Sequence, residues 1–235
     1  MTPVEHLAAT AIVTAGALLQ GTIGFGLGLF AAPLLLLLDP RLVPGPILGA
    51  SVVLTLLLAR REWHGVIAAD LGWALSGRVG GTVLALVVLT RLPAEAIERL
   101  FGSLVLLAVG ITASGLHPRP RRGVLVAVGS LSGFMGTTTS IGGPPMALLY
   151  QKEPGPRLRG TLSAYFVVGV VLSLIGLALV HRFGWVEIRL AVGLLPGILI
   201  GFLLSRRTAG WIDRGFLRPA VLVVSLAAGL LVLVR

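Results

Sequence analysis

One arginine, Arg78, lies thirteen positions from both Gly65 and Arg91, inside the apolar run ALSGRVGGTVLALV. A charged side chain at the centre of a bilayer costs at least about 2.5–3.5 kcal/mol on insertion scales, so it usually faces a cavity or a partner. The planar guanidinium group suits a sulfonate or a carboxylate. Substrate binding or gating is therefore one interpretation of Arg78. The structural alternatives are snorkelling along a tilted helix and pairing with Asp70, about two turns away.

Two stretches rich in Gly, Pro and small hydroxyl residues interrupt apolar runs, GTIGFGLG from residue 21 and GFMGTTTSIGGPP from residue 133. The recurring positions are Gly21, Gly24 and Pro33, which return 112 residues later as Gly133, Gly136 and Pro145. In a membrane, broken backbone survives only where protein buries it or where it lines a water-filled cavity. Paired interruptions at corresponding positions of two halves indicate the binding site of a transporter.

These interruptions offer chemistry for an anion. Helices that begin near Leu29 and near Pro144 would direct free N–H groups and positive dipole ends at the membrane centre. The hydroxyls of residues 137–140 could donate hydrogen bonds to anion oxygens, or the same residues could only pack and bond to their own helix. Gln20 could bind substrate or hold a loose carbonyl. The predicted substrate-binding residues are Gln20, Gly24, Phe25, Gly26, Arg78, Thr137, Thr138, Thr139, Ser140, Gly142 and Gly143.

The elements that position these residues are apolar helices. The chain of 235 residues is 56% hydrophobic and only 12% charged, whereas soluble domains carry about 25% charged residues. This composition predicts an all-α polytopic membrane protein. The net charge of +10 comes from arginines clustered between apolar spans, which favours lipid headgroups and topology signals over nucleic acid. The chain has no cysteine and no evident metal-ligand or nucleophile–base set, so we expect no enzyme, metal or cofactor.

The distribution of basic residues selects a topology. We expect two inverted-topology repeats, 1–116 and 123–235, in a single transmembrane domain, each with a broken or re-entrant helical pair followed by three transmembrane helices. The loops inside the cell would then hold Arg60, Arg61, Arg119, Arg121, Arg122, Lys152, Arg157, Arg159, Arg206, Arg207 and Arg214, against Arg41, Arg91, Arg99, Arg182, Arg189 and Arg235 outside. Parallel repeats would give almost no bias. The inverted arrangement places both termini outside the cytoplasm.

The repeat extends into later helices. Gly77 and Gly81 resemble Gly197 and Gly201, and both pairs have the spacing of small residues that permits close helix contact. The segment Ile97-Glu98-Arg99 likewise resembles 212–214, each opening the last helix of its half.

The stretches GTIGFGLGLFAAPLLL and GFMGTTTSIGGPPMALLY resemble the paired signatures of the TauE/SafE sulfite exporter family, also called the 4-toluene sulfonate uptake permease family. TRLPAEAIERLFGSLVLLAVG resembles the segment that closes the first half in that family. The resemblance implies secondary transport of small anions, especially sulfite, organosulfonates or sulfoacetate-like compounds. Four consecutive hydroxyl residues in the second stretch depart from a plain Gly-rich pattern and leave the substrate open.

The sequence therefore predicts a multi-pass transporter of the plasma (inner) membrane. It would work by alternating access around a mid-membrane anion site, and its partners would be a small anion and the lipid bilayer. An anion channel that uses the same breaks as a filter is the alternative. The coupling ion, H⁺ or Na⁺, the direction of transport and the choice between monomer and homodimer stay open.

Overall fold

The computed structural model describes residues 2–208 and 217–234, and within these residues the chain forms helices and no strands. Arg214 and Arg235, which the sequence analysis assigned to opposite sides of the membrane, lie outside the described residues, as does segment 212–214. The α-helices are α1 (Pro3–Ile23), α2 (Ala32–Leu38), α3 (Gly45–Arg61), α4 (Ala68–Arg91), α5 (Ala94–Ala113), α6 (Arg122–Thr139), α7 (Gly143–Tyr150), α8 (Gly155–Leu179), α9 (Trp185–Thr208) and α10 (Leu217–Val234).

Short helical turns join some of these elements. A π-helical turn, η1 (Leu27–Ala31), leads directly into α2, while η2 (Pro40–Leu42) and η3 (Trp63–Gly65) lie in loops. Five of the described helices, α1, α4, α5, α8 and α9, are long and apolar enough to cross a membrane. The chain is therefore a polytopic α-helical membrane protein, as its composition predicts.

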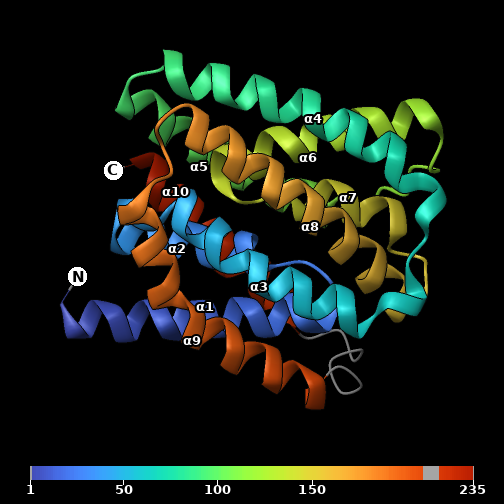
Figure 1. Ribbon diagram of the computed structural model, residues 1–235, viewed down its shortest axis with the longest axis horizontal. Coiled ribbons are helices and arrows are strands. Elements are labelled where there is room, and N and C mark those ends of the chain that lie inside the picture. The colour runs from blue at the N-terminus through green and yellow to red at the C-terminus, as the bar shows by residue number, and fades with distance from the viewer. Residues whose placement is uncertain (1, 209–216, 235) are drawn as a thin grey trace.

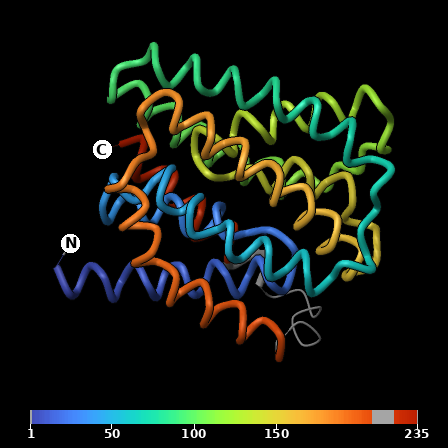
Figure 2. Tube along the Cα trace, in the orientation of Figure 1, coloured from blue at the N-terminus to red at the C-terminus, as the bar shows by residue number. Residues whose placement is uncertain are grey.

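The helices run back and forth along one common direction (Figure 1), and the N- and C-terminal ends lie at the same end of the molecule. The tube in Figure 2 shows that the loops after α3, α5 and α7 gather at the opposite end. Most of the basic residues predicted to lie inside the cell are in or beside these three loops. The two termini and the predicted inside loops are thus at opposite ends of the helices.

Glycine permits the closest helix contacts. α4 crosses α6 at Gly77 and Gly81, where a Cβ atom would overlap the carbonyl groups of Val126 and Ser130. α9 crosses α1 in the same manner at Gly197 and Gly201, where a Cβ atom would overlap the carbonyl groups of Thr10 and Thr14. The close helix contact predicted from both glycine pairs is confirmed. Each pair joins a late helix of one half to the first helix of the other.

The two interruptions are shorter than the sequence suggests. Gly21 to Ile23 still belong to α1, and Gly133 to Thr139 still belong to α6. Only residues 24–26 and 140–142 leave helical geometry, so we call these segments the first break and the second break. Gly and Thr remain helical here because membrane helices tolerate small residues that pack closely and hydroxyls that bond to their own backbone.

Candidate functional site

Both breaks begin in the same way. Gly24 ends α1 with φ 90° and Ser140 ends α6 with φ 65°, and each lies in the left-handed region. The N–H of Gly24 donates to the Gln20 carbonyl, and the N–H of Ser140 donates to the Gly136 carbonyl. These equivalent caps are 116 residues apart, not 112 as in the sequence motif. The difference of four residues is about one helical turn, so the motif identified the correct helix face one turn too early.

The two breaks pack against each other. A Cβ atom on Gly28, just after the first break, would overlap the carbonyl oxygen of Ser140 in the second. A Cβ atom on Gly143 would lie 2.8 Å from the Cβ of Phe25 in the first break. Helices resume at Leu27 and Gly143, close to the predicted starts. Residues more than a hundred positions apart thus form one junction, and glycine is required where the backbones meet.

A cavity of about 40 Å³ lies at this junction, which is room for a few water molecules or a small anion. Both breaks, α3, α4 and α8 contribute to its wall. The sequence-predicted residues that line it are Gln20, Phe25, Gly26, Arg78, Ser140, Gly142 and Gly143. Leu27, Ile47, Phe166 and other apolar side chains form the rest of the wall, together with the small hydroxyl residues Ser51 and Thr55.

Arg78 is the charged residue of this cavity. It is only 1% exposed, so it does not snorkel to the interface. Its Nη1 lies 3.3 Å from the Ser132 Oγ and its Nη2 lies 3.5 Å from the Ser173 Oγ, both longer than a usual N–H···O bond. Its Nε has no hydrogen-bond partner, and its Cζ lies 5.1 Å from the ring centroid of Tyr165.

The predicted alternative of an ion pair between Arg78 and Asp70 is wrong. Asp70 instead accepts a hydrogen bond of 3.4 Å from the Tyr150 hydroxyl, and Arg78 forms no ion pair with any described residue. A buried guanidinium without a counter-charge is unfavourable by itself, so Arg78 is suited to a bound anion.

Glycines create the space for this guanidinium group. A Cβ atom on Gly169 of α8 would overlap the Arg78 side chain, and one on Gly136 would lie 3.1 Å from its Nη2. A Cβ atom on Gly142, in the second break, would lie 3.2 Å from its Nη1. The guanidinium therefore lies against the second break. The position on α9 that corresponds to Arg78, Ile198, is a buried apolar residue, so only one half carries this charge.

Gln20 approaches the cavity from the first break. Its Oε1 accepts a hydrogen bond of 3.3 Å from the N–H of Leu27, so the side chain holds an amide at the break, where the sequence analysis expected a carbonyl. Its Nε2 has no hydrogen-bond partner among the described residues. Gln20 lines the cavity as well, which leaves that amide as a donor beside Arg78.

A model of the sulfite exporter TauE/SafE family matches residues 8–232 of the 235. The chain belongs to this family. The resemblance seen in the Gly-rich stretches is thereby confirmed over nearly the whole length, and the chain is a member of a family of membrane transporters. Neither a curated protein nor a solved structure matches it.

The threonines of this TauE/SafE chain support the second break from within, and of the described residues 137–140 only Ser140 lines the cavity. Thr137 contacts the hydroxyls of Ser173 at 2.8 Å and Thr82 at 3.2 Å. Thr138 and Thr139 each donate to a carbonyl of their own helix at 2.7 Å. Gly24 is likewise outside the lining and packs against Arg159. The predicted back-bonding alternative thus describes Thr138 and Thr139, whose hydroxyl protons are already engaged.

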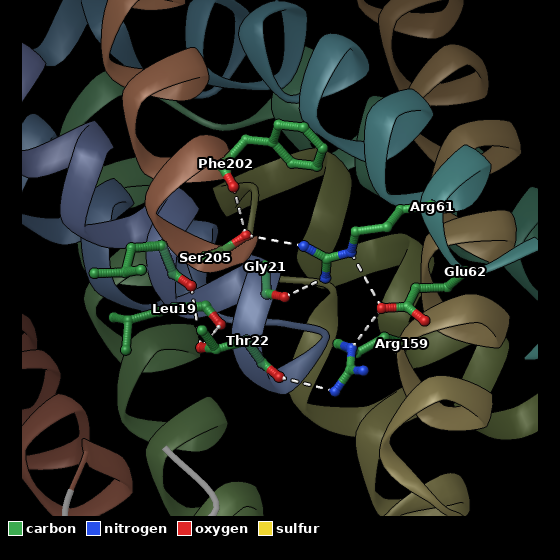
Figure 3. Close-up of polar contacts among 9 residues, drawn as sticks. Leu19, Gly21, Thr22, Arg61, Glu62, Arg159, Phe202 and Ser205 are labelled. Atoms are coloured by element: carbon green, nitrogen blue, oxygen red, sulfur yellow. Dashed lines mark hydrogen bonds and ion pairs between the residues drawn. The ribbon is translucent and has the colours of Figure 1, made fainter. Parts of the chain in front are cut away.

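A second polar cluster lies at the end of α1, and no pattern in the sequence predicted it (Figure 3). Glu62 Oε1 accepts hydrogen bonds from Arg61 Nε at 3.1 Å and from Arg159 Nε at 2.9 Å. Arg61 also donates to the Gly21 carbonyl, and Arg159 donates to the Thr22 carbonyl. We call Arg61, Glu62 and Arg159 the α1 clamp.

The α1 clamp neutralises the negative end of a helix. Two guanidinium groups hold the last carbonyls of α1, where the helix dipole favours cations. Arg61 also donates to Ser205 of α9 at 3.0 Å, so the clamp joins four helices just before the first break. From the sequence, both arginines were predicted only to mark the inside loops. Nothing in their spacing places them beside residues 21 and 22.

Proposed function

We propose that the chain is a secondary transporter of small anions, sulfur-containing ones in particular, which bind in the cavity between the two breaks. One observation carries this proposal: Arg78, buried and without an ion pair among the described residues, lines a cavity at the contact of both breaks. A cation in this environment is stabilised by an anion. Membership of the TauE/SafE family supports sulfite or an organosulfonate as the transported class.

The proposed mechanism is alternating access around this site. We infer that 1–116 and 123–235 are inverted repeats, supported by the matching contacts of Gly77 with Val126 and of Gly197 with Thr10. Two repeats that rock about their shared junction would expose the cavity first to one side and then to the other. The α1 clamp would resist this movement on its own side, because it ties α1 to three other helices.

The proposed orientation follows from charge. The loops after α3, α5 and α7 lie at one end with their basic residues, which supports a cytoplasmic position for that end in the inner membrane and an external position for both termini. A monomer contains both breaks, so one chain suffices for the site, while exposed apolar helix faces allow a homodimer. The coupling ion is part of the proposal only as an H⁺ or Na⁺ gradient.

Transport by the purified full chain in proteoliposomes tests the proposal. We expect a saturable flux of labelled sulfite that unlabelled sulfite competes with. This flux should be lost in Arg78→Gln and retained in Arg189→Gln, whose arginine lies outside the cavity lining. Flux that rises linearly with concentration at channel rates would favour the anion channel. Equal flux in empty vesicles and in both variants would refute transport through this cavity.

A further inference from the structure

We propose that the cavity accepts an anion with one negative charge and discriminates against an anion with two. This inference rests on the proposed function, because it takes the cavity to be the substrate site. It adds a rule for substrate charge that follows from the cavity wall itself.

The described wall of the cavity carries a single formal charge. Arg78 is its one ionisable side chain, and the remaining lining residues are apolar, glycine, or the neutral polar residues Gln20, Ser51, Thr55 and Ser140. The charges of the α1 clamp are outside this wall and are engaged with one another and with the carbonyls of α1. One bound monoanion therefore brings the cavity to neutrality.

Helix ends add only partial charges at the two breaks, each about half an elementary charge. Each break joins the negative end of one helix to the positive end of the next, since α1 is followed by η1 and α6 by α7. The partial charges at each break consequently have opposite signs. The two arginines of the α1 clamp donate to the carbonyls at the negative end of α1. Arg78, by contrast, has only the long contacts to Ser132 and Ser173.

The wall also offers few side-chain hydrogen-bond donors. The hydroxyls of Ser51, Thr55 and Ser140 donate to the carbonyls of Leu48, Ser51 and Pro44, respectively. Because these protons are already donated, the hydroxyls have only acceptor lone pairs left, and these repel an anion. The guanidinium of Arg78 and the Nε2 of Gln20 are the side-chain donors left for a ligand among the described lining residues.

The single charge of the wall and its few side-chain donors both disfavour a doubly charged anion. A doubly charged anion would leave one negative charge uncompensated beside Leu27, Ile47 and Phe166, where few side-chain donors replace its hydration. A monoanion with an apolar substituent satisfies the same wall. Sulfite would bind as hydrogensulfite, with its proton on the ligand because no carboxylate or histidine lines the described cavity. Its binding therefore weakens as pH rises and hydrogensulfite loses that proton.

Methanesulfonate and sulfate test the rule, because they are close in shape and differ by one charge. Isothermal titration of the full chain in detergent should give methanesulfonate an affinity at least tenfold above that of sulfate, a difference of about 1.4 kcal/mol. Sulfate binding as tightly as methanesulfonate, or more tightly, would overturn the charge rule and leave the anion site intact. Absence of binding by methanesulfonate, sulfate and sulfite alike would instead refute the proposed function.

Two variants extend the test. Ser51→Lys adds a second positive charge to the wall, and we expect it to reduce or reverse the preference for methanesulfonate. Arg78→Lys keeps one charge with fewer donors, so both affinities should fall while the preference remains. This second variant keeps the rule testable if Ser51→Lys does not fold. A preference unchanged in Ser51→Lys, or lost in Arg78→Lys, would contradict the proposal.

Discussion

Gly28 and Ser140 meet where the two breaks cross, and the absence of a side chain on Gly28 is what allows the Ser140 carbonyl to lie there. The same carbonyl belongs to the residue whose left-handed conformation ends α6. This backbone contact, together with that of Gly143 with Phe25, holds the first break against the second at the cavity that Arg78 lines. The residues after each break depend on the other half for their position.

We predict that Gly28→Ala destabilises the protein and abolishes anion binding. The added methyl overlaps main-chain atoms, which cannot rotate away, so we expect a loss of at least about 1–3 kcal/mol. Gly80→Ala on α4 is the matched control, because its Cβ meets nothing within 4 Å. Thermal unfolding and anion titration of both variants measure the effect. Equal behaviour of the two variants would show that the breaks are not in contact.

Removal of the buried charge should separate stability from function. We predict that Arg78→Met loses anion binding and is as stable as the parent chain, or more stable, in the absence of ligand. The physical reason is that an unpaired buried cation is unfavourable, and an apolar chain of similar length removes this penalty. Unfolding midpoints without ligand and with saturating methanesulfonate test it. A strongly destabilised Arg78→Met would assign Arg78 a structural role.

The threonines beside the second break should differ from one another. Thr137→Val removes a hydroxyl that joins α6 to Ser173 and Thr82, so we expect a stability loss of about 1–2 kcal/mol. Thr138→Val removes only a bond to its own helix and should cost less. Neither hydroxyl lines the cavity, so ligand affinity measured by titration should stay within a factor of three in Thr138→Val. A tenfold weaker affinity in that variant would restore Thr138 as a substrate ligand.

The α1 clamp offers a test of charge at the first break. In Glu62→Gln, two adjacent guanidinium groups lose their shared counter-charge, and we predict a destabilisation of about 1.5–3 kcal/mol. The side chains of Arg61, Glu62 and Arg159 are 19%, 13% and 12% exposed, so water screens them only in part.

Glu153→Gln is the control for this variant. Glu153 pairs with Arg157 at 3.5 Å, and the two side chains are 36% and 62% exposed, so its loss should cost less than about 1 kcal/mol. Chemical unfolding of both variants gives the comparison. Equal losses would mean that the clamp contributes no more than a surface ion pair.

The sequence was sufficient to predict the class of fold because apolar length and basic loops are local properties. It also located both breaks, since Gly-rich interruptions of apolar runs are visible without partners. The break boundaries were predicted too wide, because Gly133 to Thr139 are compatible with either a helix or a loop until their packing is known. The 112-residue motif missed the structural interval by one turn, because identical glycines serve different contacts in the two halves.

The site was predictable in part. Arg78 was recognisable because a charge inside an apolar run requires an explanation. The hydroxyls of residues 137–139 look equivalent in sequence, and only the neighbouring helices show that Thr137 bonds across the bundle while Thr138 bonds within α6. The α1 clamp could not be predicted, because Glu62 and Arg159 are far apart in the chain. The carbonyls of Gly21 and Thr22, to which the two arginines donate, carry no sequence signal.

Direct observation of a bound anion tests the central claim most sharply. A crystal of the full chain grown with 2-bromoethanesulfonate allows the ligand to be located by the anomalous scattering of bromine. We predict one strong peak in the cavity between the breaks, with the sulfonate oxygens within hydrogen-bond distance of the Arg78 guanidinium. A peak only outside this cavity, or an occupied cavity in which the sulfonate faces away from Arg78, would contradict the account.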